Sequence, residues 1–329
     1  MATLKGALRS YGATLRRIER EQKRKAREAA KKFKEQQKLQ DIRNAEKAVS
    51  DWNNYVSMLT SVHKNCTESI DWNLIENTEK PIEPEPQFIN ETIAHTNLKN
   101  YKPSFIDSLL GSSKKQVVRL ELLAKIAIKK DKEEYELAYD SYLNELEEWE
   151  ELNNICIGVK KKNIASYKDA IKYFDPFSDL NELGTQIGFI FDEDYIDINL
   201  YTNSLDTIPN YELKQTSTGK LSKREMPKTK FNELYQDHIC SATLRVAREI
   251  FAYLPLEHVR INAVIKMVDT STGHLKDQII LSVLFVPETI ENLNLNTIDP
   301  SDSMINFIHT MNFNKTKGFK GVEKAIFET

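Results

Sequence analysis

The sequence has few cysteines, glycines and prolines and no long apolar run. Its 329 residues include 3 cysteines, 10 glycines and 10 prolines. The cysteines lie far apart and form no CxxC pair, which argues against a disulfide framework and a zinc site. No apolar run reaches the 18 residues of a membrane span. No apolar signal segment opens the sequence either, so we expect a cytoplasmic chain with reduced cysteines.

Motifs for common hydrolases and nucleotide-binding proteins are also missing. The six histidines form no HxH, HExxH or HxxxH pair, which excludes the zinc hydrolases that use them. Gly219-Lys220 lacks the upstream glycine of a P-loop. The 40% hydrophobic residues nevertheless suffice for a sizeable core, so wholesale disorder is excluded.

Charge is distributed unevenly along the chain. Residues 1–50 hold 15 Lys/Arg against 6 Asp/Glu, a net charge of +9, whereas the remaining residues hold 31 against 43, a net charge of -12. A basic arm on an acidic body predicts contact with nucleic acid or with an acidic partner surface. The alternative is a solvated helix whose charge only keeps it in solution.

Residues 1–62 are expected to form a basic, helical, coiled-coil-like arm. Apolar residues recur at helical steps of three and four near both ends of this arm, and the stretch between them is almost entirely polar. An unbroken helix of this length measures roughly 90 Å, and its apolar ends need a partner. Self-association or a protein partner is therefore expected. The residues of the arm that we single out as candidates for binding nucleic acid or phosphate are Arg16, Arg17, Lys23, Arg24 and Lys25.

Two segments follow the arm. Residues 63–111 are interpreted as a linker, proline-rich at 80–86. Residues 112–183 are predicted to be helical with an acidic face, since residues 131–151 hold ten acidic residues and one lysine. This face is either a docking site for a basic helix, from the same chain or a neighbour, or a solvated surface.

Residues 184–329 show the alternation of an α+β domain. Strands are expected at 187–191, 195–201 and 208–216, a buried helix at 228–254, and a strand pair at 259–267 and 279–286. Short helices are expected at 288–293 and 301–313. With the preceding helix the order is α-β-β-β-α-β-β, which predicts an α+β fold with a mixed sheet behind a helical N-terminal half.

This order, with Asp197 on the second expected strand and Glu212-Leu213-Lys214 on the third, resembles the core of the PD-(D/E)xK nuclease superfamily. Tyr195-Ile196 stands before Asp197, without the proline of the family's pattern. The resemblance implies that Asp197 and Glu212 hold Mg²⁺ or Mn²⁺ and that Lys214 activates the attacking water. The alternative is an exposed strand face that carries charge.

A second basic cluster precedes the buried helix. It is expected to be a polar loop at the N-terminus of that helix, where backbone N–H groups favour anions. Its candidates for binding nucleic acid or phosphate are Lys220, Lys223, Arg224 and Lys228. A mobile polar loop without a ligand is the alternative.

Three functions are compatible with these patterns. The first is a non-catalytic assembly protein, whose arm forms an oligomer or complex and whose α+β domain binds a partner. The others are a metal-dependent nuclease and a sequence-independent nucleic-acid-binding protein. No cofactor is expected except Mg²⁺ or Mn²⁺ under the nuclease hypothesis.

Overall fold

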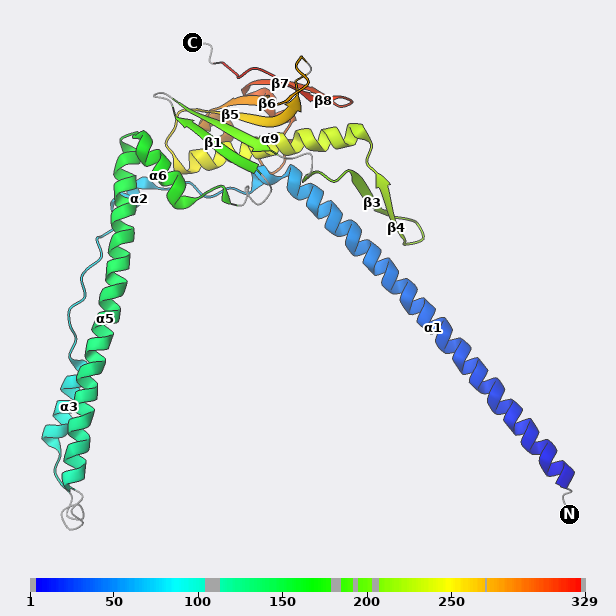
Figure 1. The fold of residues 1–329 in the computed structure, drawn as a ribbon, viewed down its shortest axis with the longest axis horizontal. Helices are drawn as coiled ribbons and strands as arrows, with labels where there is room; N and C mark the ends of the chain where they lie inside the picture. Colours follow the sequence, from blue (N-terminus) through cyan, green and yellow to red (C-terminus); the bar gives the residue numbers. More distant parts are fainter. Residues whose placement is uncertain are drawn as a thin grey trace. The chain divides into compact units, whose positions relative to one another are not determined.

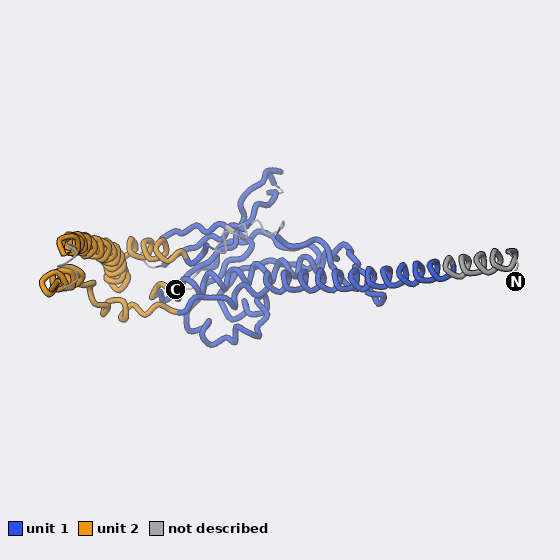
Figure 2. The backbone as a smooth tube through the Cα atoms, turned by 90° about the horizontal axis from the view of Figure 1, so that it is seen from below, with its two compact units in different colours: residues 1–68, 176–252, 256–329 blue, residues 69–175, 253–255 orange. Residues whose placement is uncertain are grey.

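A computed structural model describes residues 4–103, 113–178, 185–191, 195–202, 207–269 and 271–326 (Figure 1). Side chains are described from residue 20 onward, Thr185 excepted. The chain divides into two compact units (Figure 2). Unit 1 contains residues 1–68, 176–252 and 256–329, and unit 2 contains residues 69–175 and 253–255.

Unit 2 is built on one long helix, α5 (Ser113–Lys160). It also contains the helices α2 (Trp72–Glu76), α3 (Ile89–Asn100) and α6 (Ile164–Phe174). The chain before α5 runs back along that helix: the thiol of Cys156 donates to the carbonyl oxygen of Trp72, and Trp149 Nε1 donates to that of Thr78. The segment expected to be a linker thus contains the helices α2 and α3 in its described part, and its proline-rich part has no regular structure.

A buried carboxylate fixes α3 to α5. The N-cap residue of α3, Phe88, has no oxygen in its side chain to accept the first free N–H groups of the helix. Asp131 of α5 replaces it by accepting from the backbone N–H groups of Asn90 (3.0 Å) and Glu91 (2.7 Å). One residue of the predicted acidic face is therefore a helix cap.

Unit 1 combines a helix of 57 residues, α1 (Leu4–Thr60), with an α+β domain. This confirms the α+β fold with a long helical N-terminal part. The helix α9 (Lys228–Tyr253) lies along one face of the main sheet (Figure 1). Its side chains from Ile239 to Ala247 are buried, which explains why most residues of that stretch are apolar.

The main sheet has six strands in the order β1-β2-β5-β6-β7-β8. β2 and β5 are parallel, and every other neighbouring pair is antiparallel. The strands are β1 (Thr185–Phe191), β2 (Ile196–Thr202), β5 (Val259–Val268), β6 (Leu275–Phe285), β7 (Ile308–Asn314) and β8 (Gly318–Lys320).

Strand register separates apolar from polar side chains. Ile198, Ile261 and Val283 are opposite one another on β2, β5 and β6, and all three are fully buried. Their chain neighbours point to the other face, because side chains alternate along a strand. Among those neighbours, Asp197 pairs with Arg260 in the strand register.

Three expectations for the C-terminal half require correction. The expected third strand, β3 (Tyr211–Gln215), is outside the main sheet and pairs only with β4 (Leu221–Glu225), where a polar loop was expected. The expected helix at 301–313 is a 3₁₀ helix, η2 (Asp302–Asn306), followed by β7. The capping sequence at Asp299-Pro300 starts only this short turn, since the residues after it complete the sheet against β6.

The other elements are short. A 3₁₀ helix, η1 (Val62–Lys64), follows α1, and α10 (Pro287–Glu291) follows β6. None of the helices in the described residues is both long and apolar enough to cross a membrane.

Candidate functional site

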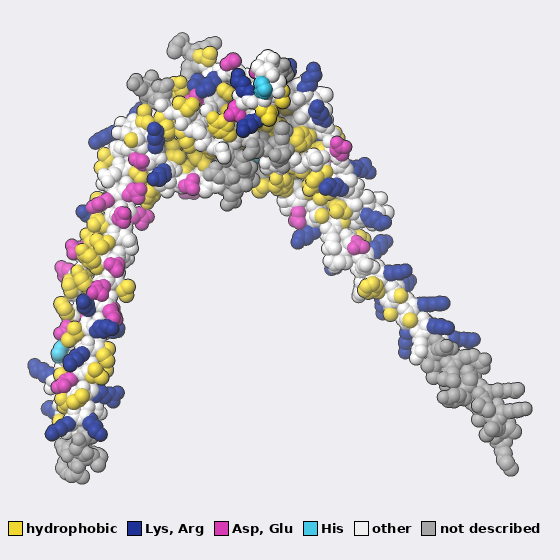
Figure 3. All heavy atoms as spheres, viewed as in Figure 1, with side chains coloured by type: hydrophobic (Ala, Val, Ile, Leu, Met, Phe, Trp, Pro, Cys, Tyr) yellow, Lys and Arg dark blue, Asp and Glu magenta, His cyan; other side chains and the backbone are white. Residues whose placement is uncertain are grey.

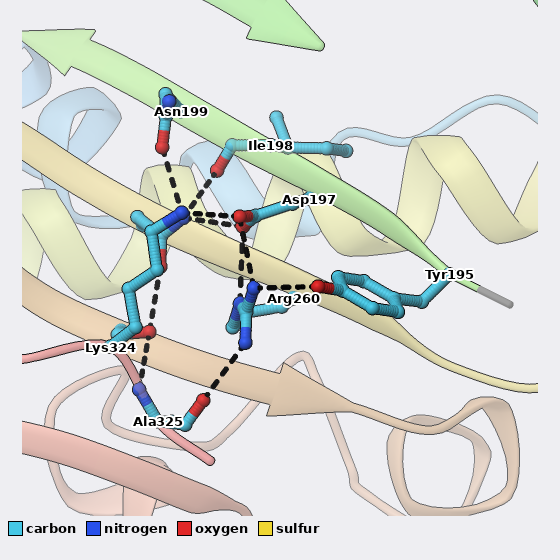
Figure 4. Close-up of polar contacts among 9 residues, drawn as sticks. Tyr195, Asp197, Ile198, Asn199, Arg260, Lys324 and Ala325 are labelled. Carbon is cyan, nitrogen blue, oxygen red and sulfur yellow. Dashed lines mark hydrogen bonds and ion pairs between the residues drawn. The ribbon is translucent and has the colours of Figure 1, made fainter. Parts of the chain in front are cut away.

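Asp197 lies in a buried polar cluster on the sheet face opposite α9 (Figure 4). Arg260 Nε and Nη2 lie 3.2 and 3.0 Å from the two oxygens of its carboxylate. Asn262 Nδ2 donates at 2.6 Å, and Lys324 Nζ donates at 2.5 Å. The adjacent strands β2 and β5 bring Asp197, Arg260 and Asn262 together because these residues share one face of the sheet, and Lys324 comes from the segment after β8.

The charges in this cluster explain the ionisation of Asp197. Burial alone would raise the pKa of the carboxyl, whose residue is only 3% exposed. Hydrogen bonds from Arg260, Lys324 and Asn262 outweigh burial, and the pKa of Asp197 is lowered. Two cations face one carboxylate, so a divalent cation here would meet net positive charge.

The cluster also fastens the C-terminal segment to the sheet. Asn262 Oδ1 accepts from the hydroxyl of Ser282 at 2.7 Å, and Ser282 Oγ accepts from the N–H of Ala325 at 3.0 Å. Arg260 Nη1 donates to the carbonyl oxygen of Ala325 at 3.2 Å. Together with Lys324, these contacts make Asp197 the anchor of residues 324–325.

Glu212 belongs to a different cluster, on the β3–β4 hairpin. Its carboxylate accepts from Lys230 Nζ at 2.5 Å and lies 3.1 Å from Lys214 Nζ. Hydrogen bonds from Lys230, then from Lys214, lower the pKa of Glu212. The structure therefore brings Glu212 and Lys214 together, but it places Asp197 on another sheet with its own cations.

This separation corrects the geometry implied by the nuclease resemblance. There the two carboxylates stand on neighbouring strands, whereas β2 has β1 and β5 as neighbours. Within the described ranges, the structure contains no group of three or more His, Cys, Asp or Glu side chains that could hold a metal ion.

A groove of about 800 Å³ lies beside the turn end of the β5–β6 hairpin. Its walls carry charges of both signs, among them Lys276, Asp277, Lys320 and Glu323. Neither Asp197 nor Glu212 lines it. The groove thus does not join the two carboxylates into one site.

The basic residues predicted to bind anions lie on α1, on the β3–β4 hairpin and at the start of α9. Lys23, Arg24 and Lys25 are exposed on α1. Figure 3 shows lysine and arginine side chains along this helix. The backbone of Arg16 and Arg17 also belongs to α1, but their side chains lie outside the described part. Lys220 and Lys228 are exposed, and so are Lys223 and Arg224 on β4.

The hairpin rests on α1 through a glycine at its turn. Gly219 has a φ of +82°, and a Cβ at this position would come within 2.7 Å of Ile42 Cγ1. Gln215 Nε2 also donates to the carbonyl oxygen of Ile42 at 3.1 Å. The two predicted basic clusters therefore belong to packed elements of one unit.

The C-terminal end of α1 is fastened to α9, a contact that sequence reasoning missed. His238 Nδ1 lies 2.9 Å from the carbonyl oxygen of Leu59, and His63 Nδ1 lies 2.8 Å from Ser241 Oγ. Arg248 donates to the carbonyl oxygen of His63. Polar residues inside the apolar α9 sequence were the available signal, because buried polar groups need partners.

Residues 20–41 of α1 are exposed at every position. The helix is held at its C-terminal end by the contacts with α9. Residues 20–41, in contrast, are not even half-buried by any other described residue. We call residues 20–41 the shaft of α1. The shaft, held by the anchored end of the same helix, is the candidate interaction site.

Comparison with known proteins identifies no relative of this chain. No family model matches the chain, and neither a curated protein nor a solved structure matches it.

Proposed function

We propose that this chain is a non-catalytic assembly protein, in which α1 joins copies or subunits and the α+β domain presents a second binding surface. The observation that carries the proposal is the exposure of residues 20–41 on a helix whose C-terminal end is anchored by buried hydrogen bonds. Anchoring gives the shaft a fixed direction from the domain, and exposure leaves it open to a partner.

One face of the shaft has the residues of a helix–helix contact. Phe33 is 65% exposed, and Ala26, Ala29 and Ala30 precede it at helical spacing. Small residues let a second helix approach closely, and a large aromatic side chain then buries much apolar area. An isolated helix gains little stability in water, so its partner would also stabilise the shaft.

The proposal for the α+β domain rests on two apolar side chains of one region. Ile305 on η2 is 83% exposed, and Ile308 on β7 is 54% exposed. These two residues are three positions apart in the chain, and exposed apolar residues are typical of protein-binding surfaces when they form a patch. We propose that this region meets the second partner.

A single substitution tests the role of the shaft. Phe33→Glu removes the aromatic side chain and adds charge, while Glu remains a good helix former. We expect the full chain to sediment as an oligomer and the variant to shift towards single chains. Phe33→Leu is the matched control, since it keeps an apolar side chain and should keep the oligomer. A wild-type chain that sediments alone at micromolar concentration would contradict the proposal.

Binding of nucleic acid is a second candidate function, favoured by the packing of the basic hairpin on α1. Its test is the salt dependence of affinity, which falls steeply when lysines and arginines neutralise phosphates. An affinity for duplex or single-stranded DNA that stays flat between low and physiological salt would exclude it.

A further inference from the structure

The long helix of unit 2 carries an acidic stripe that faces solvent. Six positions follow one another at steps of four and three residues, and all six are exposed. They are Glu133, Leu137, Asp140, Asn144, Glu147 and Glu151. At 100° per residue they lie opposite Tyr139, Tyr142, Leu146 and Trp149, the half-buried residues on the side covered by the preceding chain.

Further acidic residues beside the stripe strengthen its charge. Residues 131–151 contain ten acidic residues and one lysine, a net charge of -9. The stripe also contains Leu137, an apolar side chain that is 71% exposed. Negative charge around an exposed leucine favours a basic partner that also has aliphatic surface, as the stems of lysine and arginine do.

The exposed shaft of α1 carries a basic stripe with the same spacing. Its six positions also follow at steps of four and three, and every one is a lysine or an arginine. They are Arg20, Arg24, Arg27, Lys31, Lys34 and Lys38. Residues 20–41 hold nine basic and four acidic residues, a net charge of +5.

The two stripes correspond in length as well as in charge. Each extends over 18 residue steps, about 27 Å of helix. Steps of four and three give a repeat of 3.5 residues, the spacing at which two helices stay in contact along their length. Figure 3 shows the basic side chains along α1 and the acidic ones along α5.

We propose that the basic stripe of α1 docks on the acidic stripe of α5 in a second copy of this chain. This inference rests on the proposed assembly role of α1 and names the surface that receives it. Charge complementarity and the shared spacing match two helices of this chain to each other, and for this reason the occupant that we propose is another copy of the chain. The basic stripe lies on the side of α1 opposite Phe33, so docking leaves the apolar face free for the other contact.

The physical basis of the docking predicts its sensitivity to salt. A single exposed ion pair contributes little, because both side chains lose freedom and water screens the charges. Several pairs along one stripe act together. At 0.5 M salt, the attraction between exposed charges is screened over a distance of a few ångström, so most of these pairs contribute little. Docking should therefore be strong at low salt and weak at high salt.

Carbodiimide cross-linking of mixed chains tests the proposal directly. The reagent joins a lysine to a carboxylate that lies beside it, and mass spectrometry identifies both peptides. Full-length chains with natural and ¹⁵N isotopes are mixed at 50 mM NaCl. We expect cross-links between α1 of one isotope and α5 of the other, reduced at least fivefold at 500 mM NaCl.

Charge reversal supplies the matched variants. The arm variant carries Arg27→Glu, Lys31→Glu and Lys34→Glu, and the face variant carries Asp140→Lys, Glu147→Lys and Glu151→Lys. Each variant on its own should lose the cross-links between α1 and α5, including those formed by the stripe residues that were not substituted. A mixture of the two variants should restore cross-links between isotopes. Arg20→Lys with Arg24→Lys and Arg27→Lys keeps the charge and all lysines of the stripe, and it should keep the wild-type cross-links.

The outcomes separate this inference from the proposed function. An oligomer without α1–α5 cross-links, or with such cross-links only within one isotope, overturns the docking and leaves the assembly role intact. A wild-type chain that sediments alone overturns the assembly role itself. Loss of the cross-links between isotopes on digestion of co-purified nucleic acid overturns the inference by assigning the basic stripe to another occupant.

Discussion

The imidazole Nδ1 of His238 lies 2.9 Å from the carbonyl oxygen of Leu59, so the last turn of α1 is bound by a side chain from α9. Carbonyl groups in the last turn of a helix have no partner within the helix. Burial lowers the pKa of His238, which keeps the ring neutral at pH 7. Its Nδ1–H then donates to Leu59, and the orientation of the whole α1 helix depends on contacts of this kind.

Replacement of His238 should weaken this anchor. His238→Ala leaves the carbonyl group of Leu59 buried without its donor, which costs about 1–3 kcal/mol of the free energy of unfolding. Urea denaturation followed by circular dichroism measures the loss. His274→Ala, at an exposed histidine, is the control and should change stability by less than about 0.5 kcal/mol. Equal stability of both variants would contradict the anchoring role.

Loss of Asp197 should destabilise the α+β domain without affecting assembly. Asp197→Ala leaves Arg260 and Lys324 as like charges in a buried cluster, which we expect to cost about 3–5 kcal/mol. Urea denaturation measures this cost, and sedimentation measures assembly. Asp277→Ala, at an exposed position, is the matched control. An oligomer that dissociates in native buffer while the domain stays folded would contradict the separation of the two roles.

Metal-dependent cleavage of nucleic acid should be absent. The two predicted metal ligands are on different sheets, and each is already bound by two cations. We therefore expect duplex DNA, single-stranded DNA and RNA to remain intact with Mg²⁺ or Mn²⁺ on a denaturing gel. Cleavage that needs the metal and disappears in Glu212→Gln would restore the nuclease hypothesis.

Acidic pH should stabilise the chain through Asp237. Burial raises the pKa of this carboxyl, a hydrogen bond with Ser301 opposes the rise, and the nearby carboxylates of Asp299, Glu233 and Asp302 add to it, so that the pKa is about 6. Because the pKa is higher in the folded state, the stabilisation is complete below the unfolded pKa near 3.8 and is lost as the pH rises through about 6.

The variant Asp237→Asn isolates this effect. Between pH 5 and pH 7.5 its free energy of unfolding should rise by about 1 kcal/mol relative to wild type, allowing for the partial exposure of the group. Urea denaturation at the two pH values gives the comparison. Asp277→Asn is the control, because Asp277 is exposed and is not among the groups that shift the pKa of Asp237. An identical pH dependence of Asp237→Asn and wild type would contradict the prediction.

The long helices were predictable, since their signals are local. Long runs with few glycines and no proline, and with apolar residues at steps of three and four, predict helices over α1 and α5 from the sequence alone. The pairing of strands was less accessible. Residues 308–314 form the strand β7 because they pair with β6. The sequence of residues 301–313 does not indicate this pairing, because the partner strand lies elsewhere in the chain.

The polar clusters depend on contacts that are distant in sequence. Asp197 meets Arg260 and Lys324, which are 63 and 127 residues away. A single sequence shows that a charged residue stands on an expected strand, but it does not show which cations neutralise it. For the same reason the resemblance to a nuclease core placed Glu212 beside Asp197, whereas β3 pairs only with β4.

The most direct test of the assembly role is the mass of the chain in solution with and without residues 1–41. This truncation keeps Ile42, Leu59 and the other residues that pack α1 on the domain. We predict an oligomer for the full chain and a folded single chain for the truncated one at the same concentration, measured by sedimentation equilibrium. An oligomer of unchanged size after truncation, or a full-length chain that remains single, would contradict the account.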